Sequence, residues 1–204
     1  MTATKWNQRY SSKEYIYGIE PNAFFKTGLK TLPSGKILLP AEGEGRNALF
    51  AAQNSWNVTA FDISEAARIK AITLCNKYDV KIDYQISDYI NFSAPENSFD
   101  AIALIFAHVP ALNKKEYYHH LLSFLKPNGV VIFEAFSKKH QKNQEQNVHA
   151  GGPKDENMLF SKEELLEIFS GCKMLQIEEK DVQLTEGIGH FGNASVVRCV
   201  CRLI

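Results

Sequence analysis

The stretch Lys36-Ile37-Leu38-Leu39-Pro40-Ala41-Glu42-Gly43-Glu44-Gly45-Arg46-Asn47-Ala48 decides the fold class of this chain. It starts with a short apolar run typical of a buried strand, continues through two glycines, and leads into a helical pattern over residues 46–53. Glycines at such a turn let the backbone approach a ligand closely, and free amides at the helix N-terminus attract an anionic group. The spacing fits the G-x-G-x-x-G/A pattern, which a tight strand–helix turn without a ligand also satisfies.

Strand-like and helical patterns alternate on the C-terminal side of this stretch. Ser64 is a candidate N-cap for a helix that continues to about residue 78, and Asn113 for a helix that continues to residue 125. Four further strands are predicted at residues 57–61, 81–86, 99–106 and, after a Pro-Asn-Gly turn, 130–136. This alternation predicts an α/β fold with a doubly wound, mostly parallel sheet and helices on both faces.

The C-terminal third departs from the alternation. Residues 161–164 match a capping box before a short helix. Two strand-like runs follow, at residues 174–184 and 194–203, separated by Glu186-Gly187-Ile188-Gly189. We expect these runs to form a hairpin that closes the sheet.

Length and composition predict one domain that spans residues 1–204. Apolar residues make up 45% of the chain, and 23 basic residues balance 23 acidic ones. This balance disfavours a nucleic acid partner, and no apolar stretch is long enough to span a membrane. We therefore expect a soluble, cytoplasmic protein, either a monomer or a weak dimer. Its four cysteines are expected to be free thiols, and no metal-ligand cluster is found.

Two segments stand outside the strand–helix pattern. Residues 1–35 precede the first strand and are rich in aromatic side chains, which predicts a lid over a ligand or a covering helix. Phe24 and Phe25 are better explained as core or pocket wall. Residues 137–158 are mostly polar and contain Gly151-Gly152-Pro153, so we expect either a lid loop or a disordered segment.

Acidic side chains follow the next two strands. Asp62 ends the second strand, 19 positions after Gly43, where a carboxylate can accept hydrogen bonds from ribose hydroxyls; it can equally cap the helix near Ser64. Asp88 and Tyr89 follow the third strand, and an acid beside an aromatic ring suits an adenine. Because the carboxyl ends of parallel strands meet at one edge, these residues predict a nucleoside site beside the glycine turn.

With these residues in place, the chain resembles the class I methyltransferases that depend on S-adenosylmethionine (SAM). The resemblance is strongest to the small-molecule group that includes tellurite-resistance and thiopurine methyltransferases. It covers nearly the whole chain and rests on Trp6–Tyr10, Tyr15–Asn22, the glycine turn, Asp62, Asp88-Tyr89, Phe99–Ile102 and Leu125–Val130. It implies a Rossmann-like, seven-stranded sheet whose last strand is antiparallel. It also implies SAM as cofactor, S-adenosylhomocysteine (SAH) as product and a small-molecule acceptor, for example a soft sulfur, selenium or tellurium nucleophile.

The resemblance also implies roles for individual residues. Gly43 and Gly45 would contact the methionine part of SAM, Asp62 the ribose, and Asp88 and Tyr89 the adenine. Tyr10 and Tyr17 could close over the cationic sulfonium. The full set of expected cofactor contacts is Tyr10, Tyr17, Ala41, Glu42, Gly43, Gly45, Arg46, Asp62, Ile63, Ser64, Asp88, Tyr89, Phe106, His108 and Val109.

The first strand departs from the family pattern at two positions. Leu39 and Ala41 stand where relatives usually have an acidic residue and a glycine. Glu42 could replace the missing acidic contact to the SAM amino group. Arg46 could face the SAM carboxylate, although the helix surface is the favoured position.

His108 is the candidate general base, because it follows the fourth strand near the expected methyl group; it can equally shape the adenosine pocket. Glu134 could reach the same cleft or pair with a basic neighbour. His190 could face the acceptor, but a water-exposed turn histidine is the favoured interpretation.

Two other functions remain open. An NAD(P)-binding oxidoreductase would share the glycine pattern, but a separate substrate domain is missing and the C-terminal hairpin is the wrong ending. A non-catalytic adenosyl-binding protein is favoured only by the altered segment Leu39-Pro40-Ala41.

Overall fold

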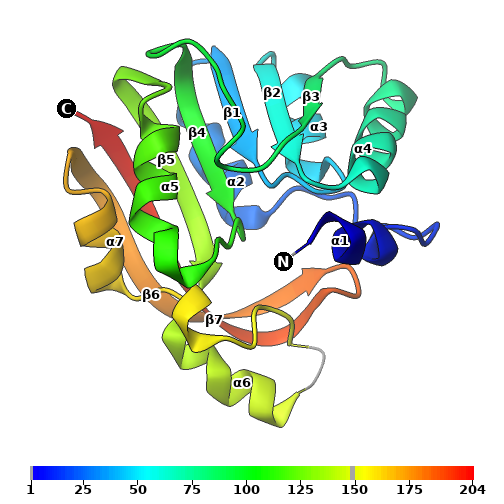
Figure 1. The fold of residues 1–204 in the computed structure, drawn as a ribbon, viewed down its shortest axis with the longest axis vertical. Helices are drawn as coiled ribbons and strands as arrows, with labels where there is room; N and C mark the ends of the chain where they lie inside the picture. Colours follow the sequence, from blue (N-terminus) through cyan, green and yellow to red (C-terminus); the bar gives the residue numbers. More distant parts are fainter. Residues whose placement is uncertain (1, 148–149) are drawn as a thin grey trace.

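The computed structural model describes residues 2–147 and 150–204, which form a seven-stranded sheet with helices on both faces (Figure 1). The strand order is β3-β2-β1-β4-β5-β7-β6. All pairs among the first five strands are parallel, and β7 runs antiparallel to both of its neighbours, as predicted. The strands are β1 (Lys36–Pro40), β2 (Asn57–Asp62), β3 (Asp83–Ile86), β4 (Phe99–Ile105), β5 (Leu125–Phe136), β6 (Cys172–Glu186) and β7 (His190–Leu203).

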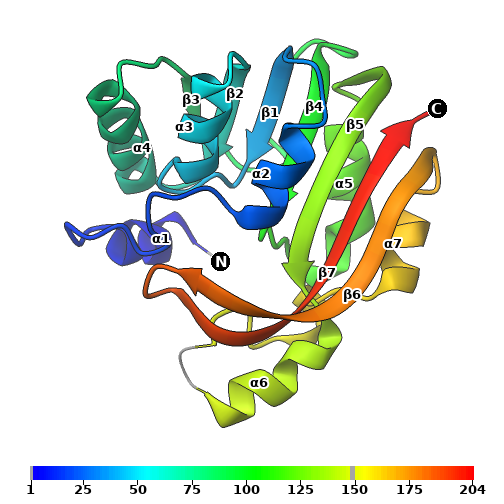
Figure 2. The same ribbon diagram turned by 180° about the vertical axis from the view of Figure 1, so that it is seen from behind.

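The helices form two layers around the sheet. Helices α2 and α3 lie in front of the sheet in Figure 2, whereas α5 and α7 cover the opposite face in Figure 1. The α-helices are α1 (Ala3–Arg9), α2 (Ala23–Leu29), α3 (Arg46–Gln53), α4 (Glu65–Lys77), α5 (Lys114–Leu122), α6 (Gln141–Gln146) and α7 (Lys162–Ile168). Three single 3₁₀ turns are η1 (Ala111–Asn113), η2 (Lys138–His140) and η3 (Glu156–Met158). No helix among the described residues is long and apolar enough to cross a membrane.

The central strands are buried on both faces because side chains alternate across the sheet. Ile37 and Leu39 pack with Ala101 on one side, whereas Leu38 and Ile102 pack with the cluster on the other side. Leu39 is thus a core residue.

The predicted elements around the glycine turn are confirmed. The strand at residues 36–40 and the helix at residues 46–53 have the predicted bounds. Ser64 caps α4, since its side chain accepts a hydrogen bond from the Ala67 amide. Phe24 and Phe25 are buried core residues of α2, as expected.

Several predicted bounds are wrong near residues 113–130. Helix α5 ends at Leu122, Asn113 makes no side-chain cap, and β5 begins at Leu125. The predicted Pro-Asn-Gly turn is instead part of β5, where Asn128 has a φ of 64°. The strand can absorb these residues because its pairing with β4 shifts register between Phe99 and Ala101, as at a β-bulge.

The prediction of a long loop at residues 137–158 needs correction. Most of its described part is helical, with η2, α6 and η3 in succession. The segment lies beside the carboxyl end of β5, and Ser137 bridges to Phe160 (Figure 1). Residues 148 and 149 of the predicted lid lie outside the described residues. A lid function for this segment stays a prediction.

The C-terminal hairpin is longer than predicted and returns to the N-terminal segment. Figure 2 shows β6 and β7 curving beneath the sheet toward α1. At its tip, the Gly189 amide donates to the Ile16 carbonyl over 2.8 Å. A Cβ on Gly187 would lie 2.4 Å from the Ile16 carbonyl oxygen, so this contact requires glycine. The hairpin tip and residues 15–22 therefore meet at the carboxyl edge of the parallel strands.

Candidate functional site

The glycine turn between β1 and α3 has a left-handed backbone at three positions. Ala41, Gly43 and Gly45 have φ values of 50°, 62° and 89°. A Cβ on Gly43 would lie 2.9 Å from the Tyr10 hydroxyl, and one on Gly45 would lie 2.6 Å from the Ala71 Cβ. Ala41 occupies a conformation that favours glycine, which is consistent with the glycine that relatives have there. The turn is therefore a tight cradle with no room for side chains.

Glu42 closes the N-terminus of α3. Its Oε1 accepts a hydrogen bond of 2.7 Å from the Ala48 amide. Burial raises the pKa of Glu42 to about 7, although the hydrogen bond from Ala48 opposes the shift. A carboxyl group is thus present beside the cradle, three positions after Leu39, where the family resemblance implies an acidic residue.

Asp62 lies at the carboxyl end of β2, opposite the glycine turn. Its side chain accepts hydrogen bonds from the amides of Gly43, over 3.2 Å, and Ser64, over 2.9 Å. Only 7% of the residue is exposed, and this burial raises its pKa to about 6. Each carboxylate oxygen still has a lone pair for a further donor. The capping and ligand-binding interpretations of Asp62 are therefore compatible.

Ser64 connects this edge to the N-terminal helix. Its hydroxyl donates to the Asn7 side-chain oxygen over 2.7 Å while it caps α4. Ile63 stands between Asp62 and Ser64 and is half-buried. These contacts position α1 beside the end of β2.

Asp88 and Tyr89 follow β3, but their environments differ. The Asp88 carboxylate accepts from the amides of Ile90 and Asn91 in an exposed turn. The Tyr89 ring packs edge-on against Phe61 with a centroid distance of 5.7 Å. Its hydroxyl is buried, and it has no hydrogen-bond partner among the described residues. Such an orphaned hydroxyl is costly unless a ligand satisfies it.

Aromatic rings gather after β4. Phe106, whose φ is 50°, lies 4.7 Å from Phe136 between ring centroids. The ring of His108 stacks at 5.8 Å from Phe136, and its Nδ1 lies 2.9 Å from the Met158 carbonyl oxygen. Burial lowers the pKa of His108 to about 4, and its Nε2 is buried without a partner in the described part of the chain. Val109 is fully buried in the adjacent core.

Two N-terminal tyrosines cover this edge. Tyr10 is buried and stacks on Trp6 with ring centroids 5.4 Å apart. The Tyr17 hydroxyl accepts a hydrogen bond from Arg9 over 2.9 Å, and its ring lies 4.5 Å from that of His190. The aromatic-rich segment therefore folds over the glycine turn.

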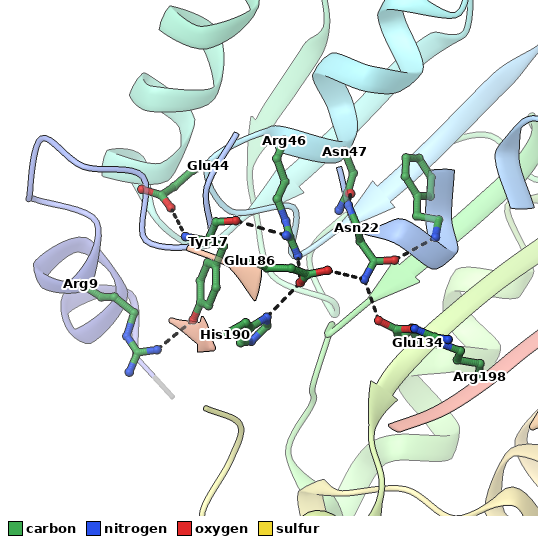
Figure 3. Close-up of polar contacts among 11 residues, drawn as sticks. Arg9, Tyr17, Asn22, Glu44, Arg46, Asn47, Glu134, Glu186, His190 and Arg198 are labelled. Carbon is green, nitrogen blue, oxygen red and sulfur yellow. Dashed lines mark hydrogen bonds and ion pairs between the residues drawn. The ribbon is translucent and has the colours of Figure 1, made fainter. Parts of the chain in front are cut away.

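The structure corrects the expected surface positions of Arg46 and His190. Arg46 donates to Glu186 over 2.7 Å and to the Tyr17 carbonyl over 3.2 Å, and the residue is 7% exposed (Figure 3). His190 is 6% exposed, and its Nδ1 lies 3.3 Å from the same Glu186 oxygen. Both side chains are buried because the hairpin carries Glu186 to the N-terminus of α3, 140 positions away.

Asn22 and Glu134 extend this buried polar network (Figure 3). The Asn22 amide nitrogen lies 2.6 Å from Glu134 and 2.9 Å from Glu186. Glu134 also pairs with Arg198, which confirms the interpretation of Glu134 as the partner of a basic neighbour. Neither Asn22 nor Glu186 stands in a sequence pattern that marks it as a site residue. The one available signal was Glu134 itself, a charge inside an apolar run that has to be paired.

Glu44, at the centre of the glycine turn, also turns away from the cradle. It accepts a hydrogen bond of 2.8 Å from the Ile16 amide and pairs with Lys70 at 2.5 Å. A cavity of about 230 Å³ lies behind this N-terminal segment. Its walls are residues 17–21, Ala23, residues 182–187 and Arg198, so it includes Glu186 but neither Gly43 nor Asp62.

Comparisons with known proteins agree with this geometry. A family model described as a methyltransferase domain matches residues 37–129. The 2-methyl-6-phytyl-1,4-hydroquinone methyltransferase of Synechocystis is 28% identical over 116 residues, which are 55% of this chain and 36% of that protein. The chain thus spans about a third of the length of this relative.

Three solved structures share the fold. One comes from work on the conversion of a disulfide bond into a thioacetal group during echinomycin biosynthesis. It has a TM-score of 0.79 at 18% sequence identity, and the match covers 98% of this chain and 92% of that chain. TehB of Haemophilus influenzae has a TM-score of 0.73 at 16% sequence identity, and the match covers 99% of this chain and 67% of TehB. The N-methyltransferase NodS of Bradyrhizobium japonicum in complex with SAH has a TM-score of 0.69 at 12% sequence identity, and the match covers 98% of this chain and 97% of NodS. Residues 37–129 therefore match a methyltransferase domain, and the whole chain shares the fold of these three structures, one of which is an N-methyltransferase in complex with SAH.

Proposed function

We propose that this chain transfers a methyl group from SAM to a small-molecule acceptor at the carboxyl edge of β1, β2 and β4. The observation that carries the proposal is the meeting of three features at that edge: the cradle of Gly43 and Gly45, the buried carboxylate of Asp62, and the unpartnered hydroxyl of Tyr89. A tight turn alone would require the glycines, but it would leave the buried Tyr89 hydroxyl unexplained.

The proposed cofactor contacts follow from this arrangement. Gly43 and Gly45 line the methionine part, Glu42 pairs with the amino group, and Asp62 accepts from the ribose hydroxyls. The other proposed contacts are Tyr10, Tyr17, Ala41, Ile63, Ser64, Asp88, Tyr89, Phe106, His108 and Val109. Arg46 acts indirectly, because Glu186 already neutralises its charge.

SAM, when bound, supplies an activated methyl group, so the protein mainly aligns the acceptor and excludes water. The rings of Tyr17, Phe106 and Phe136 support this role, because they enclose the edge from the N-terminal segment and from β4 and β5. Apolar walls suit a soft nucleophile, which is weakly hydrated, and we propose a sulfur, selenium or tellurium acceptor. The disulfide-to-thioacetal chemistry named for one structural neighbour favours sulfur, whereas the relative in Synechocystis acts on a hydroquinone. A cytoplasmic location and a monomer or weak dimer remain predictions.

Calorimetric titration with SAM, SAH and NAD tests the cofactor. We expect binding of SAM and SAH and none of NAD, because the site recognises one adenosine with a cationic tail. Binding of NAD alone would contradict the proposal and favour the oxidoreductase alternative.

An assay of methyl transfer tests whether the protein is catalytic. Purified protein with SAM labelled in the methyl group is offered thiols, phenols, selenite and tellurite, and methylated products are identified by mass spectrometry. SAM binding without product from any acceptor would favour the non-catalytic adenosyl-binding alternative.

A further inference from the structure

His190 lies where the hairpin, the N-terminal segment and the end of β4 meet. Its ring centroid is 4.5 Å from that of Tyr17, 4.4 Å from that of Phe106 and 5.2 Å from that of Phe136. Phe106 directly follows β4, the position at which the transferred methyl group is expected. His190 is therefore an ionisable group inside the aromatic wall of the proposed acceptor site.

Glu186 orients the His190 ring. The Glu186 oxygen that lies 3.3 Å from His190 Nδ1 also accepts from Arg46 over 2.7 Å. The other oxygen accepts from Asn22 over 2.9 Å. Burial raises the pKa of Glu186, but the contacts with His190 and Arg46 outweigh it and hold this pKa at about 2, so Glu186 is an anion that accepts the Nδ1 proton. The Nε2 of a neutral His190 consequently carries the lone pair.

This Nε2 atom is free to act. Within residues 2–147 and 150–204 it makes no hydrogen bond, and it is not among the fully buried atoms. His108 differs, because its Nδ1 meets only a neutral carbonyl and its ring is enclosed by Phe136 and Phe160. A partner that stabilises the protonated form favours a base, and of His108 and His190 only the latter has an anionic one.

We infer that His190, oriented by Glu186, accepts the proton of the methyl acceptor, and that this acceptor is a thiol. The inference rests on the proposed function, since it assigns a proton acceptor and a substrate class to that site. His190 is the catalytic residue and Glu186 is a positioning residue.

The step balances as an acid–base reaction coupled to displacement. The S–H bond of the thiol breaks and its proton moves to Nε2 of His190. The thiol sulfur forms a bond to the methyl carbon, while the bond from that carbon to the SAM sulfur breaks and its electron pair neutralises the sulfonium. Deprotonation of a thiol, with a pKa of about 8.5, is within reach of a histidine, whereas a phenol, at about 10, is a weaker acid.

Several groups face His190 and influence its charge. Glu186 on β6 favours the protonated ring, whereas Arg46 on α3 and His140 on η2 oppose it, and burial lowers the pKa of His190. Tyr17, in the N-terminal segment, contributes only its ring face. His190 is therefore neutral at neutral pH, as a base must be.

Two thiols test the inference. Benzyl mercaptan is protonated at about pH 7 and needs a base, whereas 4-nitrothiophenol is already a thiolate. The variant His190→Asn keeps a donor toward Glu186 but removes Nε2. We expect its rate with benzyl mercaptan to fall by about 10²- to 10⁴-fold, with a change of less than about threefold for 4-nitrothiophenol. The residual rate of His190→Asn with benzyl mercaptan should rise about tenfold per pH unit, because the fraction of free thiolate rises by that factor.

His108→Asn and His119→Asn are the matched controls. His108→Asn should affect both thiols equally, since His108 only shapes the site. His119 lies on α5 against the Ile168 carbonyl, and its variant should match the wild type. Glu186→Asp should regain part of the activity with benzyl mercaptan that Glu186→Gln loses, because aspartate keeps an anion for His190 Nδ1.

The possible failures are distinguishable. If the wild type does not bind SAM, the proposed function is wrong. If SAM binds but only phenols or only preformed thiolates are methylated, the thiol and base assignment is wrong. Equal losses with both thiols in His190→Asn, or a thiol-selective loss in His108→Asn, would also overturn the assignment, and thermal unfolding identifies any variant that is merely unfolded.

Discussion

Asp62→Asn should separate cofactor binding from stability. Asp62 is buried, and its pKa is raised from 3.8 to about 6. A raised pKa in the folded state means that the protonated form contributes stability below about pH 4, and that this contribution is lost as the pH rises through about 6. A shift of about 2 pKa units corresponds to ~3 kcal/mol, so the buried charge costs about that much at neutral pH.

Asparagine removes this cost but cannot accept from both neighbouring amides. Asp62 accepts from Gly43 and Ser64, and the amide nitrogen would meet one of these donors, losing ~1 kcal/mol. We therefore expect the unliganded variant to be about 1–2 kcal/mol more stable at pH 7.5. SAM binding should weaken by about 10- to 150-fold, because hydrogen bonds to a charged acceptor contribute about 1.5–3 kcal/mol.

Titration calorimetry with SAM and urea unfolding of the unliganded protein measure the two effects. The wild type should bind SAM more tightly as the pH rises from 5 to 7, since the carboxylate ionises near pH 6, and the variant should lack this dependence. Asp100→Asn is the matched control: Asp100 lies near the start of β4, at the opposite edge, and pairs with Lys126. Unchanged SAM affinity in Asp62→Asn, or equal weakening in Asp100→Asn, would refute the reasoning.

Two further predictions concern the framework of the site. Gly45→Ala should lower the free energy of unfolding in urea by at least ~2 kcal/mol, because φ is 89° and the new Cβ would lie 2.6 Å from that of Ala71. In the control Gly171→Ala, no atom lies within 4 Å of the new Cβ, and the free energy of unfolding should stay within ~0.5 kcal/mol of the wild-type value. Equal effects of the two substitutions would count against the cradle. Glu134→Gln should lower the free energy of unfolding by about 1.5–3 kcal/mol, because the half-buried Arg198 loses its charged hydrogen-bond partner and keeps the longer 3.8 Å contact with Glu178. A loss below ~1 kcal/mol in the same assay would show that the pair is solvated.

Local patterns were sufficient for most of the fold. The strand at residues 36–40, the helix after it and the Ser64 cap depend on neighbouring residues, so the sequence predicts them with correct bounds. The turn expected at residues 127–129 lies inside β5, whose pairing with β4 passes from Leu125 to Val130 and leaves residues 126–129 without a register partner on β4. Asn128 keeps a left-handed backbone there, with a φ of 64°, so the local turn preference survives as a bulge within a strand that tertiary pairing extends on both sides.

The fold class and the meeting of Gly43 with Asp62 at one edge of the sheet could be predicted from the sequence, since parallel strands bring their carboxyl ends together. The contacts among Arg46, Glu186 and His190, on which their proposed roles rest, are visible only in the tertiary structure. Their pairing spans 140 positions and depends on how far the hairpin curves back, which no local periodicity encodes. Burial then changes their chemistry, because a charge in a dry environment must find a partner, and the Glu186 carboxylate that pairs with Arg46 also lies 3.3 Å from Nδ1 of His190.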